Sequence, residues 1–282
     1  MWMMLLTGCW LSTDEFAEWR AAADTGDGSV EKAAVLETLS YSFIQAGTFE
    51  MGCTSGQSNC EEDEEPAHTV TLTTSFWMTV TELTQDQYQA LMGDNPSDFS
   101  SCGDCPVENI SWHQAALATN ALSEFEGREL CYSCSDTECE APTHPYACAG
   151  YRLPTEAEWE FAARCGEDLL YAGSNDLDEV GWYRENSAAV THYVAEKAAN
   201  DCGLYDMSGN VWEWVNDWYN SEYYSVGDSV DPTGDPSGSR RVFRGGGWGS
   251  YEEGSRVSDR ADDLPSDRYY TRGMRLVISD PG

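Results

Sequence analysis

The stretch from residue 203 to residue 218 reads GLYDMSGNVWEWVNDW and contains three tryptophans, two glycines and several acidic residues. Gly209 and Asn210 tolerate a positive φ angle, so a tight turn can form there at little cost. Such a turn lets carboxylates and backbone carbonyls converge on one point, and an all-oxygen set suits a hard cation such as Ca²⁺. The candidate ligands are the side chains of Asp206 and Glu213 and the carbonyl groups of Gly209 and Val211. The alternative is a turn between two buried aromatic strands whose carboxylates are merely solvated.

The composition bounds the class of protein. The chain has 282 residues, of which 41% are hydrophobic, and this is enough for one large domain or for one domain and a tail. Its 25 glycines and 11 tryptophans indicate a loop-rich fold held by large aromatic side chains rather than a helix bundle. The formal net charge of -35 repels phosphate backbones and attracts cations, so we expect no nucleic-acid partner.

The N-terminal residues predict an exported lipoprotein. An apolar start ends in Leu6-Thr7-Gly8-Cys9, which is similar to a bacterial lipobox whose cysteine is lipidated. The basic segment and longer apolar core of a signal peptide do not precede it, and a chance apolar start is the alternative. Eleven cysteines indicate an oxidising compartment, and removal of Cys9 leaves an even number that can pair completely. We therefore expect a lipid anchor at Cys9 that holds the protein in the cell envelope, at the outer membrane or the cell surface.

The sequence divides into three parts. Residues 1–9 read as a signal remnant, residues 10–40 as an acidic tether with some helix, and residues 41–282 as the folded domain. Within that domain, a hydroxyl residue followed three positions later by Gln or Glu marks the start of a helix. The three pairs are Thr84 with Gln87, Ser111 with Gln114, and Thr155 with Glu158, and they predict helices over 85–92, 112–126 and 156–164.

The remaining ten cysteines predict five disulfides. Cys53 and Cys60 can close a polar loop, and Cys165 and Cys202 can join the end of the third helix to the 203–218 stretch. The other six are Cys102, Cys105, Cys131, Cys134, Cys139 and Cys148, whose pairing the sequence leaves open. The last four of these could instead form a zinc site, but disulfides are favoured in an exported protein.

Seven motifs occur in the order found in one known family. They are GTFEMG at 47–52, TELTQDQYQALMG at 81–93, PVENISWHQA at 106–115, YRLPTEAEWEFAAR at 151–164, GLYDMSGNVWEWVNDWY at 203–219, RVFRGGGW at 241–248 and RGMRLV at 272–277. From about residue 41 to residue 279 the chain resembles the formylglycine-generating enzyme, or sulfatase-modifying factor, family. The resemblance implies an α+β domain with an irregular C-type-lectin-like fold, short helices, small twisted sheets and many loops.

The resemblance also supports the cation site. The ligands of the family's structural calcium site fall at the positions of Asp206, Gly209, Val211 and Glu213, although some relatives carry Asn where Asp206 stands. A second calcium site in some family enzymes draws on the preceding stretch. Here that stretch, at 181–201, reads GWYRENSAAVTHYVAEKAAND and does not match. We therefore expect one structural Ca²⁺.

The sequence departs from the family's enzymes at the residues that bind their copper. These enzymes bind copper through two cysteines shortly after the RGG motif, and the corresponding residues here are Ser250 and Ser255. Cu(I) selects soft thiolates, whereas a serine hydroxyl is neither soft nor charged at neutral pH. Gly247 also stands where those enzymes usually carry a serine. We expect no copper and no oxidation of a substrate cysteine.

Two functions remain open. The first is a lipid-anchored, calcium-stabilised binding module for a peptide, protein or glycan. Its groove would be lined by Trp248, Tyr251, Arg256, Arg260, Tyr269 and Tyr270, although these residues could simply pack under a long loop. The second is an oxidoreductase that generates formylglycine on sulfatases, or a divergent oxidase on the same fold. Ser250 and Ser255 favour the first function.

Overall fold

The computed structural model describes residues 29–135 and 137–280, so the predicted lipidation site at Cys9 lies outside the described residues. The chain divides into two compact units, one up to Thr38 and one from Leu39 onward. The described part of the first unit holds one helix, α2 (Ser29–Leu36). No helix within the described ranges is long and apolar enough to cross a membrane.

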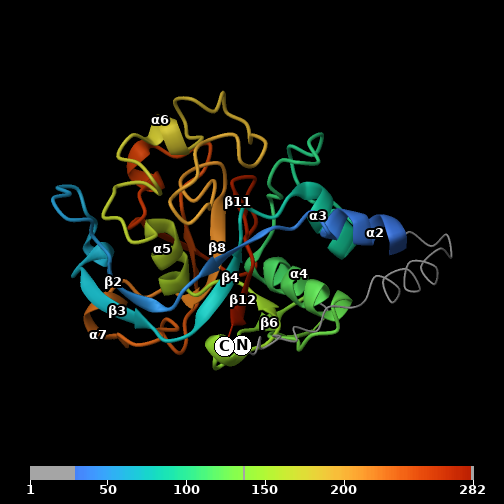
Figure 1. Cartoon of the computed structure of the whole chain (residues 1–282), viewed down its shortest axis with the longest axis horizontal. Coiled ribbons are helices and arrows are strands. Elements are labelled where there is room, and N and C mark those ends of the chain that lie inside the picture. Colours follow the sequence, from blue (N-terminus) through green and yellow to red (C-terminus); the bar gives the residue numbers. More distant parts are fainter. Residues whose placement is uncertain (1–28, 136, 281–282) are drawn as a thin grey trace, which may run out of the picture. The chain divides into compact units, whose positions relative to one another are not determined.

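The first sheet of the second unit is built from both ends of that unit's sequence (Figure 1). Its strands, in spatial order, are β1 (Tyr41–Ile44), β4 (Ser75–Thr79), β12 (Val277–Asp280) and β7 (Tyr151–Arg152). Neighbouring strands run antiparallel, and Met78 of β4 lies opposite both Ser42 of β1 and Val277 of β12. Because β4 is flanked by the first and last strands, the two ends of the unit are joined in one sheet.

The second sheet carries the tryptophan-rich stretch. Its strands, in spatial order, are β10 (Arg260–Asp263), β9 (Arg241–Arg244), β8 (Trp212–Trp218) and β11 (Arg272–Gly273). Strand β8 pairs antiparallel with β9 and parallel with β11. Along β8, Trp214 and Val215 are fully buried, so this strand lies in the core of the unit.

Three helices begin where the capping boxes predict. They are α3 (Gln85–Met92), α4 (Trp112–Phe125) and α5 (Glu156–Arg164). In each helix the hydroxyl of Thr84, Ser111 or Thr155 accepts a hydrogen bond from the backbone N–H three residues later, and that residue's side chain reaches back to the N-cap N–H. The shorter elements are β2 (Gly47–Met51), β3 (His68–Leu72), β5 (Ser133–Cys134), β6 (Cys139–Glu140), α6 (Leu177–Val180) and α7 (Tyr223–Val226).

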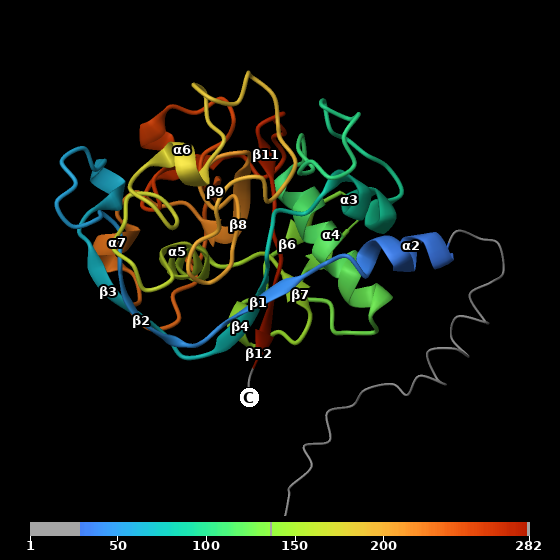
Figure 2. The same ribbon diagram turned by 45° about the horizontal axis from the view of Figure 1, so that its top comes forward.

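Indole groups fasten two of these helices to β8, which lies between α4 and α5 (Figure 2). Trp112 at the start of α4 donates from Nε1 to the carbonyl of Val215 at 2.8 Å. Trp159 of α5 donates from Nε1 to Glu213 Oε2 at 2.7 Å. Both indoles are fully buried, so each N–H requires the acceptor that β8 supplies.

The cysteine prediction is confirmed. The structure contains the two predicted disulfides, Cys53–Cys60 and Cys165–Cys202. The pairings that the sequence left open are Cys102–Cys105, Cys131–Cys148 and Cys134–Cys139. The zinc alternative for the last four cysteines is therefore wrong, because each of their sulfur atoms is used in a disulfide.

Candidate functional site

The turn before β8 has the backbone conformation that its sequence predicts. Asp206, Gly209 and Asn210 adopt φ angles of 58°, 97° and 57°, all in the left-handed region. A Cβ atom at Gly209 would lie 2.4 Å from the carbonyl oxygen of Trp182, so no larger residue fits there. The N–H of Asn210 donates to that same carbonyl at 2.8 Å. The turn is thus held against the loop that precedes it.

Glu213, the second residue of β8, is buried and faces an arginine. Arg275 donates to both of its carboxylate oxygens, from Nε at 2.6 Å and from Nη2 at 2.7 Å. Trp159 adds a third donor to Oε2. Oε1 therefore accepts one of these three hydrogen bonds and keeps a lone pair for a further ligand.

Two more buried carboxylates lie close to Glu213. Asp206 Oδ2 accepts the N–H of Ala195 at 2.7 Å, while Oδ1 is buried and has no hydrogen-bond partner among the described residues. Glu82 accepts the Asn210 side-chain amide at 2.7 Å and the Val211 N–H at 2.9 Å. We call Glu82, Asp206 and Glu213 the carboxylate cluster. The sequence offered no signal for Glu82 beyond an acidic residue beside the buried Leu83.

The carboxylate cluster carries more negative charge than Arg275 can neutralise. Burial, and then repulsion by Asp206 and Glu213, raises the pKa of Glu82 well above its ordinary value. Burial is also the main cause that raises the pKa of Asp206 to about 6. In the part of the chain that the structure describes, the only set of three acidic, histidine or cysteine residues at metal-ligand spacing is Cys53, Cys60 and Glu65, whose cysteines form a disulfide. The calcium site stays a prediction, for which backbone carbonyls would have to supply part of the ligand set.

Ser250 and Ser255, at the positions of the family's copper-binding cysteines, lie in the segment that follows β9. Ser250 Oγ accepts the N–H of Gly247 at 3.0 Å, and the Ser250 N–H donates back to the Gly247 carbonyl at 2.8 Å. Ser255 is fully buried, and its Oγ has no hydrogen-bond partner within the described ranges. Both serines therefore carry neutral hydroxyls in a tight loop.

Aromatic side chains of this loop and of two other loops form a patch, which we call the aromatic surface. Its members are the exposed Tyr251, Tyr269 and Tyr270 and the half-buried Phe99 and Trp248, from the loops that follow α3, β9 and β10. The rings of Trp248 and Tyr270 stack with centroids 5.6 Å apart, and Phe99 meets Trp248 edge-on at 5.5 Å. Trp248 Nε1 donates to the Tyr270 carbonyl at 3.2 Å, which fixes the pair. Such rings offer apolar faces and polar edges to a ligand.

Two of the predicted groove residues lie elsewhere. Arg256 is 2% exposed and pairs with Glu64 at 2.8 Å and with Asp259 at 3.2 Å. Arg260 is 6% exposed, and its Nε lies 2.6 Å from Glu156 Oε1. The prediction that these arginines line a groove is wrong, because acidic partners from distant parts of the sequence hold them in the interior.

A buried glutamate supports the aromatic surface from below. Glu108 is fully buried, its Oε1 accepts the N–H of Phe99 at 2.9 Å, and its Oε2 has no hydrogen-bond partner among residues 29–135 and 137–280. Burial raises the pKa of Glu108 to about 7. A carboxyl whose folded-state pKa is raised stabilises the protein at low pH, and this contribution is lost as pH rises through the folded pKa.

We therefore expect the melting temperature in calcium-free buffer to fall between about pH 5 and pH 8, and Glu108→Gln to make that fall smaller. The fall should not vanish, because burial also raises the pKa of Asp259 to about 7 and that of Asp217 to about 8. Thermal unfolding followed by circular dichroism across this range measures the slope. Glu124→Gln, on the exposed face of α4, is the control. An unchanged slope in Glu108→Gln would contradict the raised pKa of Glu108 as a cause of this pH dependence.

The fold and site together define an α+β domain of the C-type-lectin-like class, with short helices, small twisted sheets and long loops. Residues 26–280 match the sulfatase-modifying factor enzyme 1-like domain. The chain belongs to the formylglycine-generating enzyme, or sulfatase-modifying factor, family, as its motifs predict.

Relatives of this chain carry the names of a chaperone, a formylglycine-generating enzyme and a protein kinase. The chain is 34% identical over 237 residues to the chaperone protein LppX of Paenibacillus barcinonensis, and this match covers 72% of this chain and 80% of that protein. It is 30% identical over 277 residues to the formylglycine-generating enzyme of Streptomyces coelicolor, covering 83% and 87% of the two chains. Serine/threonine-protein kinase pkn1 of Chlamydia caviae is matched over 83% of this chain but over only 37% of the kinase.

Among solved structures, Treponema denticola variable protein 1 superposes with a TM-score of 0.76 at 34% identity. The match covers 86% of this chain and 95% of that protein. The fold therefore extends over nearly the whole of that relative.

Proposed function

We propose that this protein is a calcium-stabilised, lipid-anchored binding module. It is a member of the family, but one without oxidase activity. The observation that carries the proposal is the aromatic surface, which the Ser250 loop and two other loops of the folded unit assemble. Large exposed aromatic rings that are held in fixed positions are typical of ligand-contact surfaces. A relative named as a chaperone further supports the binding of a peptide or protein, and a glycan is the alternative ligand.

The residues at the family's copper positions do not fit copper. The Ser250 hydroxyl is used by a backbone N–H, and the Ser255 hydroxyl is buried and neutral. Cu(I) needs soft, charged sulfur ligands, and every cysteine among the described residues is in a disulfide. We therefore propose no oxidase step for this chain.

The residues at the family's calcium position do fit a hard cation. Asp206 Oδ1 is a buried carboxylate oxygen that lacks a hydrogen-bond partner among the described residues, and Glu213 Oε1 keeps a lone pair. Calcium would supply the positive charge that offsets repulsion within the carboxylate cluster. Asp206 and Glu213 would hold it through side chains, and Gly209 and Val211 through carbonyl groups.

An exported location is the third part of the proposal. Five disulfides require an oxidising compartment to form and persist. Cys9, at the end of the lipobox-like segment, would carry the lipid and attach the protein to the cell envelope.

The enzymatic alternative has a direct test. We expect no formylglycine when the purified protein is given Cu(I), oxygen and a peptide with the sulfatase-type CxPxR sequence, as judged by mass spectrometry. The reason is the absence of thiolate ligands at Ser250 and Ser255. A copper-reconstituted formylglycine-generating enzyme run in parallel shows that the assay works. Catalytic turnover by this protein would overturn the proposal and return it to the oxidases.

Binding can be tested on the aromatic surface itself. We expect peptides selected from a random library on the immobilised protein to lose at least about tenfold in affinity when Trp248 and Tyr270 are both changed to alanine. The control is the double change Phe43→Ala and Trp77→Ala, which removes another exposed aromatic pair with ring centroids 5.0 Å apart. Equal losses in both variants would count against the aromatic surface.

A further inference from the structure

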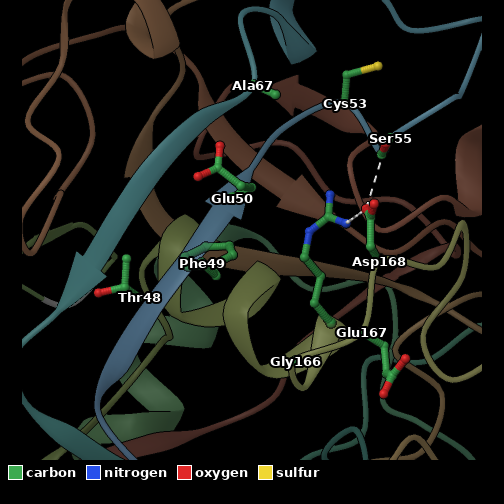
Figure 3. A pocket seen from close by; sticks show the side chains of 10 residues that line it. Thr48, Phe49, Glu50, Cys53, Ser55, Ala67, Gly166, Glu167 and Asp168 are labelled. Carbon is green, nitrogen blue, oxygen red and sulfur yellow. Dashed lines mark hydrogen bonds and ion pairs between the residues drawn. The ribbon is translucent and has the colours of Figure 1, made fainter.

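A groove of about 500 Å³ lies on the side of the unit where β2 ends (Figure 3). One wall is β2, through Thr48, Phe49 and Glu50, and the loop that follows it. The other wall is the end of α5 and the residues just after it, from Arg164 to Asp168. None of the residues of the aromatic surface lines this groove.

The groove follows the free edge of a strand. Strand β2 pairs with β3 alone, and no backbone hydrogen bond to another segment of the described chain is found for residues 48–50. Consecutive strand residues point to opposite faces of a sheet, yet all three line the groove, and no residue of β3 does. The groove therefore borders the edge of β2, where N–H and C=O groups can accept another strand.

The rim of the groove is acidic. Glu50 stands on the β2 wall, and Glu167 and Asp168 stand on the opposite wall, all three exposed. Arg164, the cation in the lining, is 7% exposed and is already bound, through Nε to Glu160 at 2.8 Å and through Nη2 to the Gly52 carbonyl at 2.5 Å. Its Nη1 also lies 3.6 Å from Asp168 Oδ1 and offsets part of that charge, so Glu50 and Glu167 contribute most to the acidity of the rim. Within the described ranges these three acids do not form a set at metal-ligand spacing. The rim thus suits an extended cationic ligand better than a metal ion.

Two disulfides hold the walls in place. Cys53–Cys60 closes the loop that carries Ser55, and Cys165–Cys202 fixes the chain immediately before Gly166. The N–H of Ser55 donates to Asp168 Oδ1 at 3.3 Å and so joins one wall to the other. A groove that is already formed in the free protein costs a ligand less ordering entropy.

We propose that this groove binds an extended, basic peptide segment of a partner protein by strand addition to β2. Backbone groups of the peptide would pair with the edge of β2. Its lysine or arginine side chains would meet Glu50, Glu167 and Asp168, with their aliphatic stems along Phe49. The site is separate from the aromatic surface and does not depend on the function proposed for it.

The probe is a short fluorescent peptide of alternating lysine and valine, titrated into the folded protein. We expect binding that weakens with salt, and Glu167→Lys should lower the affinity by about tenfold, since a rim carboxylate is replaced by a like charge. Glu124→Lys on α4, which makes the same charge change outside the groove, is expected to bind as the wild type does. Slowed hydrogen exchange is expected in the complex at the amides of Thr48 and Glu50, which face the free edge because the backbone groups of their partner Thr71 and its ladder neighbour Thr69 point away from β2.

Two comparison peptides separate strand addition from simple charge attraction. The same peptide with alternate amides N-methylated should bind much more weakly, and a glutamate–valine peptide should not bind. Trp248→Ala should leave the lysine–valine peptide bound, which keeps the result independent of the aromatic surface. Equal binding of the N-methylated peptide, or equal loss in Glu167→Lys and Glu124→Lys, would overturn the proposal.

Discussion

Replacing Arg275 by methionine is expected to lower the free energy of unfolding by about 3–5 kcal/mol. Arg275 is fully buried, pairs with both oxygens of Glu213, and also donates to the carbonyl groups of Thr79 at 3.1 Å and Tyr205 at 2.9 Å. Without it, the carboxylate cluster keeps its negative charge and loses its neutralising cation. Chemical denaturation in calcium-free buffer measures the loss.

An exposed arginine provides the matched control. Arg240 is 44% exposed and pairs with Asp262 and with Asp263, the latter at 3.1 Å. Arg240→Met should change the free energy of unfolding by no more than about 1 kcal/mol, because water screens such pairs. Similar losses in the two variants would mean that burial of the carboxylate cluster does not determine the cost.

The second large effect is expected from calcium. If Ca²⁺ binds the folded protein and not the unfolded chain, saturation at about a thousand times the dissociation constant adds about 4 kcal/mol of stability. Excess chelator should therefore lower the melting temperature of the wild type, and isothermal calorimetry should find one site. An unchanged melting temperature on chelation would show that the carboxylate cluster holds no calcium.

Asp206→Ala tests the ligand assignment directly. This variant should lose the stabilisation by calcium, and it should lie close to the wild type in chelator because the buried carboxylate then has no cation to bind. Asp201→Ala, a few residues earlier and exposed, removes the same side chain outside the site and should respond to calcium as the wild type does. A calcium response retained in Asp206→Ala would contradict the assignment.

Local features of this fold could be predicted from sequence because their causes are local. The N-caps at Thr84, Ser111 and Thr155 depend on residues three positions away. The turn at Gly209 depends on a positive φ angle that glycine adopts without strain. The disulfide Cys165–Cys202 followed from the even count and from the motifs on either side.

The features that could not be predicted depend on contacts between distant segments. Glu82 reaches the 203–218 turn from a position 129 residues before Val211. Arg256 was expected at the surface, but its partner Glu64 lies 192 residues earlier in the sequence. The free edge of β2 was also hidden, since a strand pattern does not show which of its sides will be paired.

Because β1 and β12 both pair with β4, the chain enters and leaves this domain along one strand. Tyr41 lies opposite Thr79 and Asp280 lies opposite Ser75, so the two ends of the unit meet opposite ends of a single five-residue strand. At the rise of a β-strand, four residues separate them by about 13 Å along its direction. Neighbouring entry and exit points allow a domain to be inserted into a host chain, or joined to one at either end, without opening its core. This geometry suits a unit whose match in a chlamydial kinase occupies only 37% of that longer protein.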